Sequence, residues 1–378
     1  MPKALPSGEL GGSGSGKTTL LYQRIRARAE KGEKSILLVP EQFTSSTEGR
    51  IYRELGDALS GMVESFSFTS LAEKILSTEG GAAVQTLSDA GRAVLVRRAL
   101  EELQDNVHYY HRHRRSAAFC QMAAQTIDEL KSAGLSGQQL AQLAGACGAE
   151  SGKLSELALI FQGYETLLAR SGMDPSDRLE LAGARLEEAL ARHSLPEFLR
   201  DRAVFIDEFD TFNAPKKRLL GAMLAALPSV TVALCDDGAP LLPGDLSLFS
   251  GAKQVAAQLR QLARKNGAEV AVPQLLRKDL RHRNAPGLAA VAELLETGSC
   301  TADAPAGEVR LFAAPSREEE ARAAAGAIRR LMRQGVRCGK IAVVCRDIAK
   351  YRAAVRYEFR MAEIPLYCDE PTTPEFSA

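Results

Sequence analysis

Short apolar runs alternate along the chain with longer stretches in which apolar residues recur every three or four positions. Three runs have the length of buried strands and end in polar or turn residues, namely SILLVP (35–40), RAVFIDE (202–208) and SVTVALCDDG (229–238). Four stretches have the spacing of amphipathic helices: 87–104, 116–134, 153–171 and 176–192. The pattern predicts an α/β fold in which a helical insertion interrupts a parallel sheet.

The order of these elements predicts three domains. We expect a sheet domain from residues 1–82 together with 200–300, and the helical insertion from residues 83–199. A short linker at 301–307 then leads to the start of a second, incomplete α/β domain over 308–378.

The second domain is expected to begin as strand, helix, strand. Apolar runs within 308–315 and 340–345 predict the two strands. Between them, residues 317–335 predict an amphipathic helix with acidic residues first and basic residues last, which matches the helix dipole.

A glycine-rich loop stands near the amino terminus. Gly11, Gly16, Lys17 and Thr18 match the phosphate-loop pattern G-x-x-x-x-G-K-[ST], in which main-chain amides surround a phosphate, the lysine reaches the β- and γ-phosphates and the hydroxyl binds Mg²⁺. We therefore expect ATP and Mg²⁺ to bind here. The predicted ATP-binding residues are Gly11, Gly12, Ser13, Gly14, Ser15, Gly16, Lys17, Thr18 and Thr19.

The strand that should precede this loop is poorly supported by the sequence. Pro6 and Gly8 stand where an apolar run is expected, so a plain Gly/Ser linker is the alternative interpretation. The helix and strand that follow the loop, at 18–32 and 35–40, come in the order that a phosphate-binding unit requires. This order favours a nucleotide site.

An acidic pair closes the second predicted strand. Asp207 is expected to support the Mg²⁺ ion, and Glu208 is expected to orient or deprotonate the attacking water, which makes Lys17 and Glu208 the candidate catalytic residues. Asp236 and Asp237 follow the next strand and either sense the γ-phosphate or close a turn, and the turn is favoured.

Spacing and composition narrow the class of protein. About 190 mostly helical residues separate the loop from the acidic pair, which suits a nucleic-acid motor better than a small-molecule kinase. The net charge of +1 gives no global attraction to nucleic acid, so any DNA contact must be local. No apolar run is long enough for a membrane span or a signal peptide. Seven cysteines without a C-x-x-C pair are typical of buried thiols in a cytoplasmic protein.

Several stretches, in this order, resemble one family. They are GSGSGKTTL (12–20), ILLVPEQFT (36–44), ESFSFTSLAEKIL (64–76), LSDAGRAVLVRRAL (87–100), KLSELALIFQGYETLL (153–168), VFIDEFDTF (204–212) and GEVRLFAAPSREEEARAAAGAIRRL (307–331). Together they are similar to the N-terminal part of the AddB family, whose members are one of the two subunits of the bacterial ATP-dependent helicase/nuclease AddAB. The resemblance implies a P-loop NTPase fold with a RecA-like parallel sheet of the superfamily-1 helicase kind.

The resemblance also implies partners and an activity. Family members pair with an AddA helicase subunit and process single- and double-stranded DNA ends at double-strand breaks for recombinational repair. They are longer and carry a nuclease domain with an iron–sulfur cluster, so we expect this chain to be a fragment and the cluster only in a C-terminal region that it lacks. The alternative is a non-catalytic scaffold that binds DNA and partners around a structural nucleotide site.

Two kinds of segment are candidate DNA contacts. By resemblance, the motor motifs around PEQFT and SFSFTSLA imply DNA contacts at Gln42, Thr44, Ser67 and Thr69, with simple helix capping as the other interpretation. The segment 106–119 gathers histidine, tyrosine and arginine, so it either binds DNA or is a solvated loop. Its candidate contacts are Arg112, Arg114 and Arg115. A second basic stretch, 277–284, is interpreted as charged surface.

Overall fold

A computed structural model describes residues 7–81, 83, 85–148, 151–299 and 308–368. The chain divides into two compact units, residues 1–302 and 303–378. The predicted linker at 301–307 lies outside the described residues.

The first unit is built on a six-stranded sheet in the order β3-β2-β4-β5-β1-β6. All of its strand pairs are parallel. The strands are β1 (Ser7–Gly11), β2 (Ser35–Leu38), β3 (Val63–Phe66), β4 (Ala203–Ile206), β5 (Ser229–Cys235) and β6 (Gln274–Leu276). The predicted α/β class with a parallel sheet is therefore confirmed.

The strand before the glycine-rich loop is present, although its sequence did not support one. Strand β1 pairs with β5 on one side and with β6 on the other, so its main-chain groups are held from both edges. Only main-chain groups form these bonds, so an interior strand can contain Gly8 and the charged Glu9. Glu9 is fully buried and its carboxylate forms an ion pair of 3.1 Å with Arg24 on helix α1 (Lys17–Ala29).

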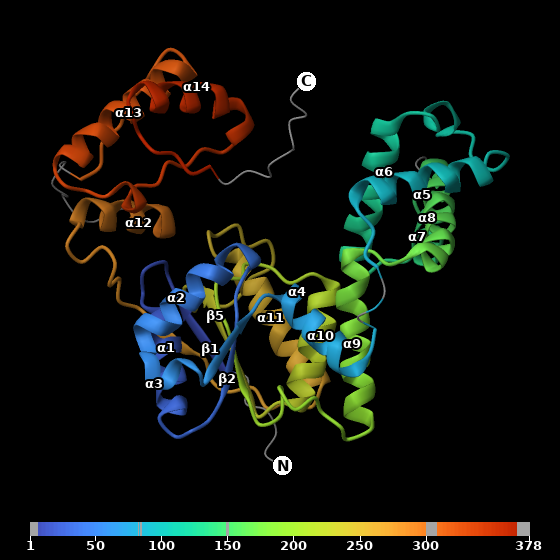
Figure 1. The fold of residues 1–378 in the computed structure, drawn as a ribbon, viewed down its shortest axis with the longest axis horizontal. Coiled ribbons are helices and arrows are strands. Elements are labelled where there is room, and N and C mark those ends of the chain that lie inside the picture. Colours follow the sequence, from blue (N-terminus) through green and yellow to red (C-terminus); the bar gives the residue numbers. More distant parts are fainter. Residues whose placement is uncertain (1–6, 82, 84, 149–150, 300–307, 369–378) are drawn as a thin grey trace. The chain divides into compact units, whose positions relative to one another are not determined.

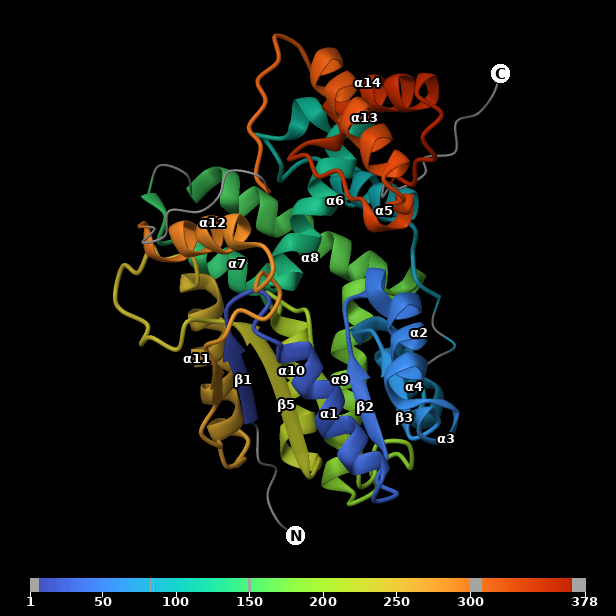
Figure 2. The same ribbon diagram turned by 90° about the vertical axis from the view of Figure 1, so that its left-hand side faces the viewer.

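Both faces of the sheet are buried, because alternate residues of each strand point to opposite sides. Helices α1 and α2 (Thr44–Leu55) cover one face of the sheet, and a second layer of helices covers the other (Figures 1 and 2). Leu37 and Phe205 belong to the core cluster on the first face, whereas Leu38 and Ile206 belong to the cluster on the second. The second layer consists of α4 (Phe68–Glu79), α9 (Pro175–Ala191), α10 (Ala214–Ala226) and α11 (Ser250–Lys265). The short helix α3 (Asp57–Ser60) follows α2.

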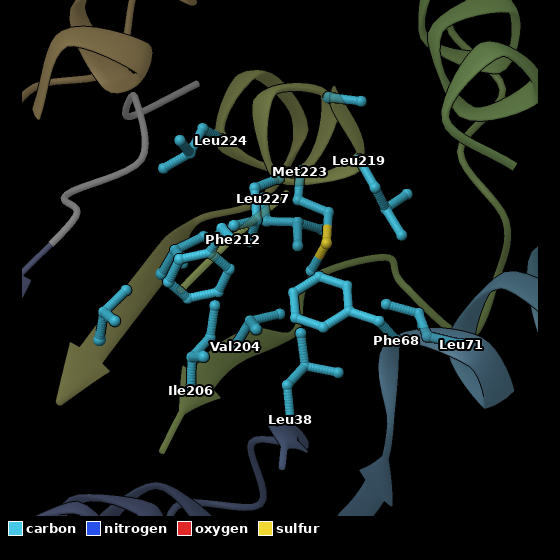
Figure 3. Close-up of a cluster of buried hydrophobic side chains, with 14 of the residues drawn as sticks. Leu38, Phe68, Leu71, Val204, Ile206, Phe212, Leu219, Met223, Leu224 and Leu227 are labelled. Carbon is cyan, nitrogen blue, oxygen red and sulfur yellow. The ribbon is translucent and has the colours of Figure 1, made fainter. Parts of the chain in front are cut away.

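The larger core cluster lies under this second layer (Figure 3). Phe68, at the start of α4, meets the rings of Phe209 and Phe212 edge to face, with centroids 5.2 and 6.0 Å apart. Such aromatic pairs contribute beyond the apolar area that they bury. They fix the segment after β4, which carries the acidic pair, against the start of α4.

The helical insertion has a core of its own. It consists of α5 (Asp89–Glu102), α6 (Ala117–Ser132), α7 (Gly137–Ala144) and α8 (Ser151–Ser171). Phe161 and Tyr164 on α8 are among its fully buried side chains. The four helices predicted from periodicity are present as α5, α6, α8 and α9, but the buried face of α9 belongs to the core of the sheet. The domain boundaries proposed from the sequence stay a prediction.

The remaining helix of the first unit, α12 (Pro286–Thr297), follows the basic stretch 277–284. The second unit contains α13 (Arg317–Arg333) and α14 (Ile348–Met361), which pack through Ile328 and Phe359. Helix α13 has glutamates in its first turn and arginines in its last, as the sequence predicted.

The strands predicted on either side of α13 are wrong. The described residues of 308–315 and 340–345 form no strand, and Leu311 and Val344 are among their most exposed apolar side chains. A strand is held by hydrogen bonds to a neighbouring strand. Within residues 308–368 neither apolar run is hydrogen-bonded to a neighbouring strand, so neither run forms a strand.

Candidate functional site

The glycine-rich loop joins the end of β1 to the start of α1, at the carboxyl edge of the sheet. Gly14 and Gly16 have φ angles of 80° and 93°, which side chains rarely adopt. A Cβ atom at Gly11 would lie 2.4 Å from the hydroxyl of Ser15 and 2.6 Å from the carbonyl oxygen of Leu276. The loop therefore requires glycine for both its curvature and its close packing.

Lys17 is the first residue of α1. Its ammonium group donates hydrogen bonds of 2.9 Å to the carbonyl oxygens of Gly11 and Gly12, so it is held across the loop. Thr18, the next residue, forms a side-chain hydrogen bond with Asp207. The loop and the acidic pair predicted from the sequence are thus brought together, although about 190 residues separate them.

Asp207 and Glu208 follow β4, which lies two strands away from β1. Burial raises the pKa of Asp207, while the hydrogen bond with Thr18, the amide of Glu208 and the charges of Arg50 and Lys17 oppose the rise. Partial desolvation and the neighbouring Asp207 also raise the pKa of Glu208, which is an exposed residue, against the charge of Arg50. Glu208 has a left-handed φ of 64°, which is uncommon for a residue with a side chain and marks a strained turn.

These groups line one pocket of about 470 Å³. The loop contributes Ser13, Gly14, Gly16, Lys17, Thr18 and Thr19, and the segment after β4 contributes Asp207, Glu208, Phe209 and Asp210. Ligands of open α/β sheets bind at the carboxyl ends of the strands, where the strand order reverses. The pocket lies at such a reversal. The chain passes from β1 to β2, which lies on the far side of β4 and β5, and later returns to form these two strands between β1 and β2.

Two arginines of this pocket were not predicted from the sequence. Arg50 comes from α2. Arg281 comes from the basic stretch 277–284, whose interpretation as plain charged surface is incomplete. Its guanidinium donates a 3.1 Å hydrogen bond to the hydroxyl of Ser13, and the amide of Leu280 donates one of 3.0 Å to the carbonyl oxygen of Gly14. The excess of arginine in this stretch was the available signal.

Asp236 and Asp237 close a turn, which is the interpretation that the sequence favoured. The Asp236 carboxylate accepts a hydrogen bond of 2.7 Å from the amide of Gly238, and that of Asp237 accepts one of 2.8 Å from Ala239. Lys253 also pairs with Asp237 at 3.1 Å. Neither aspartate lines the pocket that contains Lys17.

The candidate DNA residues around PEQFT and SFSFTSLA lie close together. Gln42 and Thr69 are exposed, and the hydroxyl of Thr69 donates to the carboxylate of Glu41, which joins the two segments. Thr44 begins α2 and its hydroxyl donates to the main-chain carbonyl of Glu41 at 2.6 Å. Ser67 is buried and its side chain accepts the amide of Ser70 in a capping box, so capping accounts for its hydroxyl.

The segment 106–119 is an ordered turn in which aromatic and basic residues are separated. The carboxylate of Glu156 on α8 accepts hydrogen bonds from the amides of His108, Tyr109 and Tyr110. The rings of Tyr110 and His113 pack against Phe119. Arg112 and Arg115 are exposed, and Arg114 is half-buried beside His111.

Other kinds of site receive no support within the described part of the chain. No group of three or more histidine, cysteine, aspartate or glutamate side chains is arranged to hold a metal ion there. The six described cysteines are free thiols, and Cys300 lies outside the described residues. None of the described helices combines the length and the apolar character needed to cross a membrane.

Comparison with known proteins agrees with the family that the sequence resembles. Residues 9–292 match the family described as "ADDB, N-terminal". The chain is 34% identical to a protein of Desulforudis audaxviator that is named as the B subunit of an ATP-dependent helicase/deoxyribonuclease, over 95% of this chain and 31% of that protein. Proteins with the same name from Symbiobacterium thermophilum and Moorella thermoacetica are 33% and 32% identical, over 96% and 95% of this chain.

The chain spans about a third of the length of these curated relatives, because each alignment covers 31% or 32% of the relative. The family match covers the sheet, the glycine-rich loop, the helical insertion and the acidic pair. The chain therefore belongs to the family of AddB N-terminal regions.

Proposed function

We propose that this chain is the ATP-binding, helicase-like part of an AddB-type subunit. In this proposal the sheet is RecA-like, and the whole subunit acts with an AddA-like partner on single- and double-stranded DNA ends during the repair of double-strand breaks by recombination. One observation carries the proposal: Lys17 and Thr18 line the same pocket as Asp207 and Glu208.

The residues of the pocket fit a magnesium nucleotide. The loop offers main-chain amides next to the amino terminus of α1, which attracts phosphate. The hydroxyl of Thr18 and the carboxylate of Asp207 are hard oxygen ligands, which Mg²⁺ prefers. When bound, Mg²⁺ would neutralise phosphate charge as ATP reacts.

Each residue of the pocket then has a separate task. Lys17 would exchange its bonds to the loop carbonyls for bonds to the β- and γ-phosphates. Glu208, whose pKa is raised by partial desolvation and by Asp207, would hold the attacking water and accept its proton. Candidate DNA contacts are Gln42, Thr44 and Thr69, together with the exposed arginines of 106–119.

A second candidate function has one observation in its favour. The ammonium of Lys17 already has two main-chain acceptors, so the loop is satisfied without a phosphate. A scaffold that binds DNA and partners would need no more than this, and its nucleotide site would be structural.

Binding and turnover of nucleotide by the 378-residue chain test the proposal. Lys17→Ala is expected to abolish binding of Mg-ATP in a calorimetric titration, whereas Glu208→Gln is expected to retain binding and lose hydrolysis. Lys31→Ala, which changes an exposed lysine just after α1, is the matched control. Wild-type protein that binds no nucleotide would refute the proposal. Binding that single-stranded DNA does not affect, with no hydrolysis, would favour the scaffold.

A further inference from the structure

Arg50 is a basic residue of the pocket that neither the glycine-rich loop nor the acidic pair accounts for. It lies midway along α2, the helix that follows β2, and lines the pocket together with Lys17, Thr18 and Asp207. It is half-buried, and it is one of the residues that line the site. The pocket thus receives a positive charge from two separate helices.

The guanidinium group of Arg50 is positioned but has unused donors. Its central carbon lies 5.0 Å from the centroid of the Tyr22 ring on α1, a cation–π contact that holds the group in place. Tyr22 itself is buried, and burial raises the pKa of its hydroxyl to about 12. Among the described residues, the side chain of Arg50 forms no hydrogen bond or ion pair besides its contact with Tyr22. The N–H donors of its guanidinium are therefore available to a ligand.

The position of Arg50 indicates which part of a bound nucleotide its guanidinium group would contact. It lines the pocket together with both Asp207 and Glu208, the residues that follow β4. Glu208 is the residue proposed to hold the attacking water, so Arg50 lies on the side of the pocket where the terminal phosphate would react. A planar guanidinium can donate two parallel bonds to phosphate oxygens.

We propose that Arg50 binds the terminal phosphate of ATP and thereby makes this site distinguish a nucleoside triphosphate from a diphosphate. The proposal rests on the proposed function, since it requires that nucleotide binds at the glycine-rich loop. It adds that α2 supplies the residue that recognises the γ-phosphate. In the competing role, Arg50 is structural and only balances the charge of the acidic pair.

The two roles predict different selectivities. The test measures the dissociation constants of Mg²⁺ complexes of ADP and of a non-hydrolysable ATP analogue for the 378-residue chain. Arg50→Ala is expected to weaken binding of the analogue by about tenfold or more, because a hydrogen bond to a charged group is lost. Binding of ADP is expected to change by less than about twofold, and Arg50→Lys is expected to lie between wild type and Arg50→Ala.

The matched control is Arg53→Ala on the same helix. Arg53 is exposed, donates to the carbonyl oxygen of Gly49 and does not line the pocket, so both affinities should stay unchanged. Equal losses for both nucleotides, or no loss for the analogue, would overturn the proposal. If Arg50→Ala does not fold, Arg50→Gln supplies the same comparison with a neutral side chain. Wild-type protein that binds neither nucleotide would instead refute the proposed function itself.

Discussion

The buried Glu9 makes the stability of the fold depend on pH in a way that can be calculated. It lies on β1, an interior strand of the sheet, pairs with Arg24 on α1 and has no exposed surface. Its ion pair with Arg24 and its burial act in opposite directions, and burial is the larger effect. Burial raises the pKa of Glu9 from its ordinary value of 4.5 to about 7, against the charge of Arg24, and the charge of Asp207 contributes to the rise.

The sign of the effect follows from this direction. A group with a raised pKa in the folded state contributes stability that is present below the unfolded pKa and is lost as the pH rises through the folded pKa. A difference of one in pKa corresponds to about 1.4 kcal/mol, so the full loss is about 3 kcal/mol. We expect the wild-type chain to lose about this amount relative to Glu9→Gln between pH 4.5 and about pH 7.

The assay is urea unfolding of the wild-type chain and Glu9→Gln at closely spaced pH values on both sides of this range. Glutamine buries an amide and shifts stability by a constant amount, so the difference between the two proteins should vary with pH only through Glu9. Glu9→Met is the matched comparison. Methionine should shift the free energy of unfolding by a different constant amount, but the difference between wild type and variant should vary with pH in the same way. Parallel profiles would refute the reasoning. Increasing wild-type stability with pH would mean that Arg24 outweighs burial.

Three further substitutions test other parts of the first unit. Gly8→Ala is expected to stabilise the chain in urea by about 0.5–1 kcal/mol, because its Cβ would meet Pro273 at 3.4 Å beside an apolar cavity of about 60 Å³. Gly11→Ala should destabilise it, and a loss of stability in both variants would contradict this account. Burial raises the pKa of Glu156, but hydrogen bonds from the amides of Tyr109, His108 and Tyr110 outweigh burial and lower that pKa. Because Glu156→Ala removes the acceptor of these bonds, amide hydrogen exchange of residues 108–110 is expected to accelerate by about tenfold. Unchanged exchange would show that these bonds do not order the turn.

The sequence predicted most of the first unit because its signals there are local or follow general rules of sheet assembly. The apolar runs at 35–40, 202–208 and 229–238 contain β2, β4 and β5, and they are buried on both faces as such runs require. Strand β1 had little support from the sequence, because this strand depends on residues elsewhere in the chain. It pairs with β5 and β6, and Arg24 offsets the charge of its Glu9. The predicted strands of the second unit failed for the opposite reason, since an apolar pattern without a partner makes no ladder.

The difference between the predicted and the unpredicted parts of the pocket has one physical cause. Parallel strands bring their carboxyl ends to one edge of a sheet, so the residues after β1 and β4 must lie near each other whatever the length of the insertion between them. Lys17 and Asp207 could therefore be paired from sequence. Arg50 and Arg281 reach the same pocket from a helix and from a long connection, and no rule of strand order fixes the approach of either. Their positions depend on packing against Tyr22 and on hydrogen bonds to the loop, which only the folded chain contains.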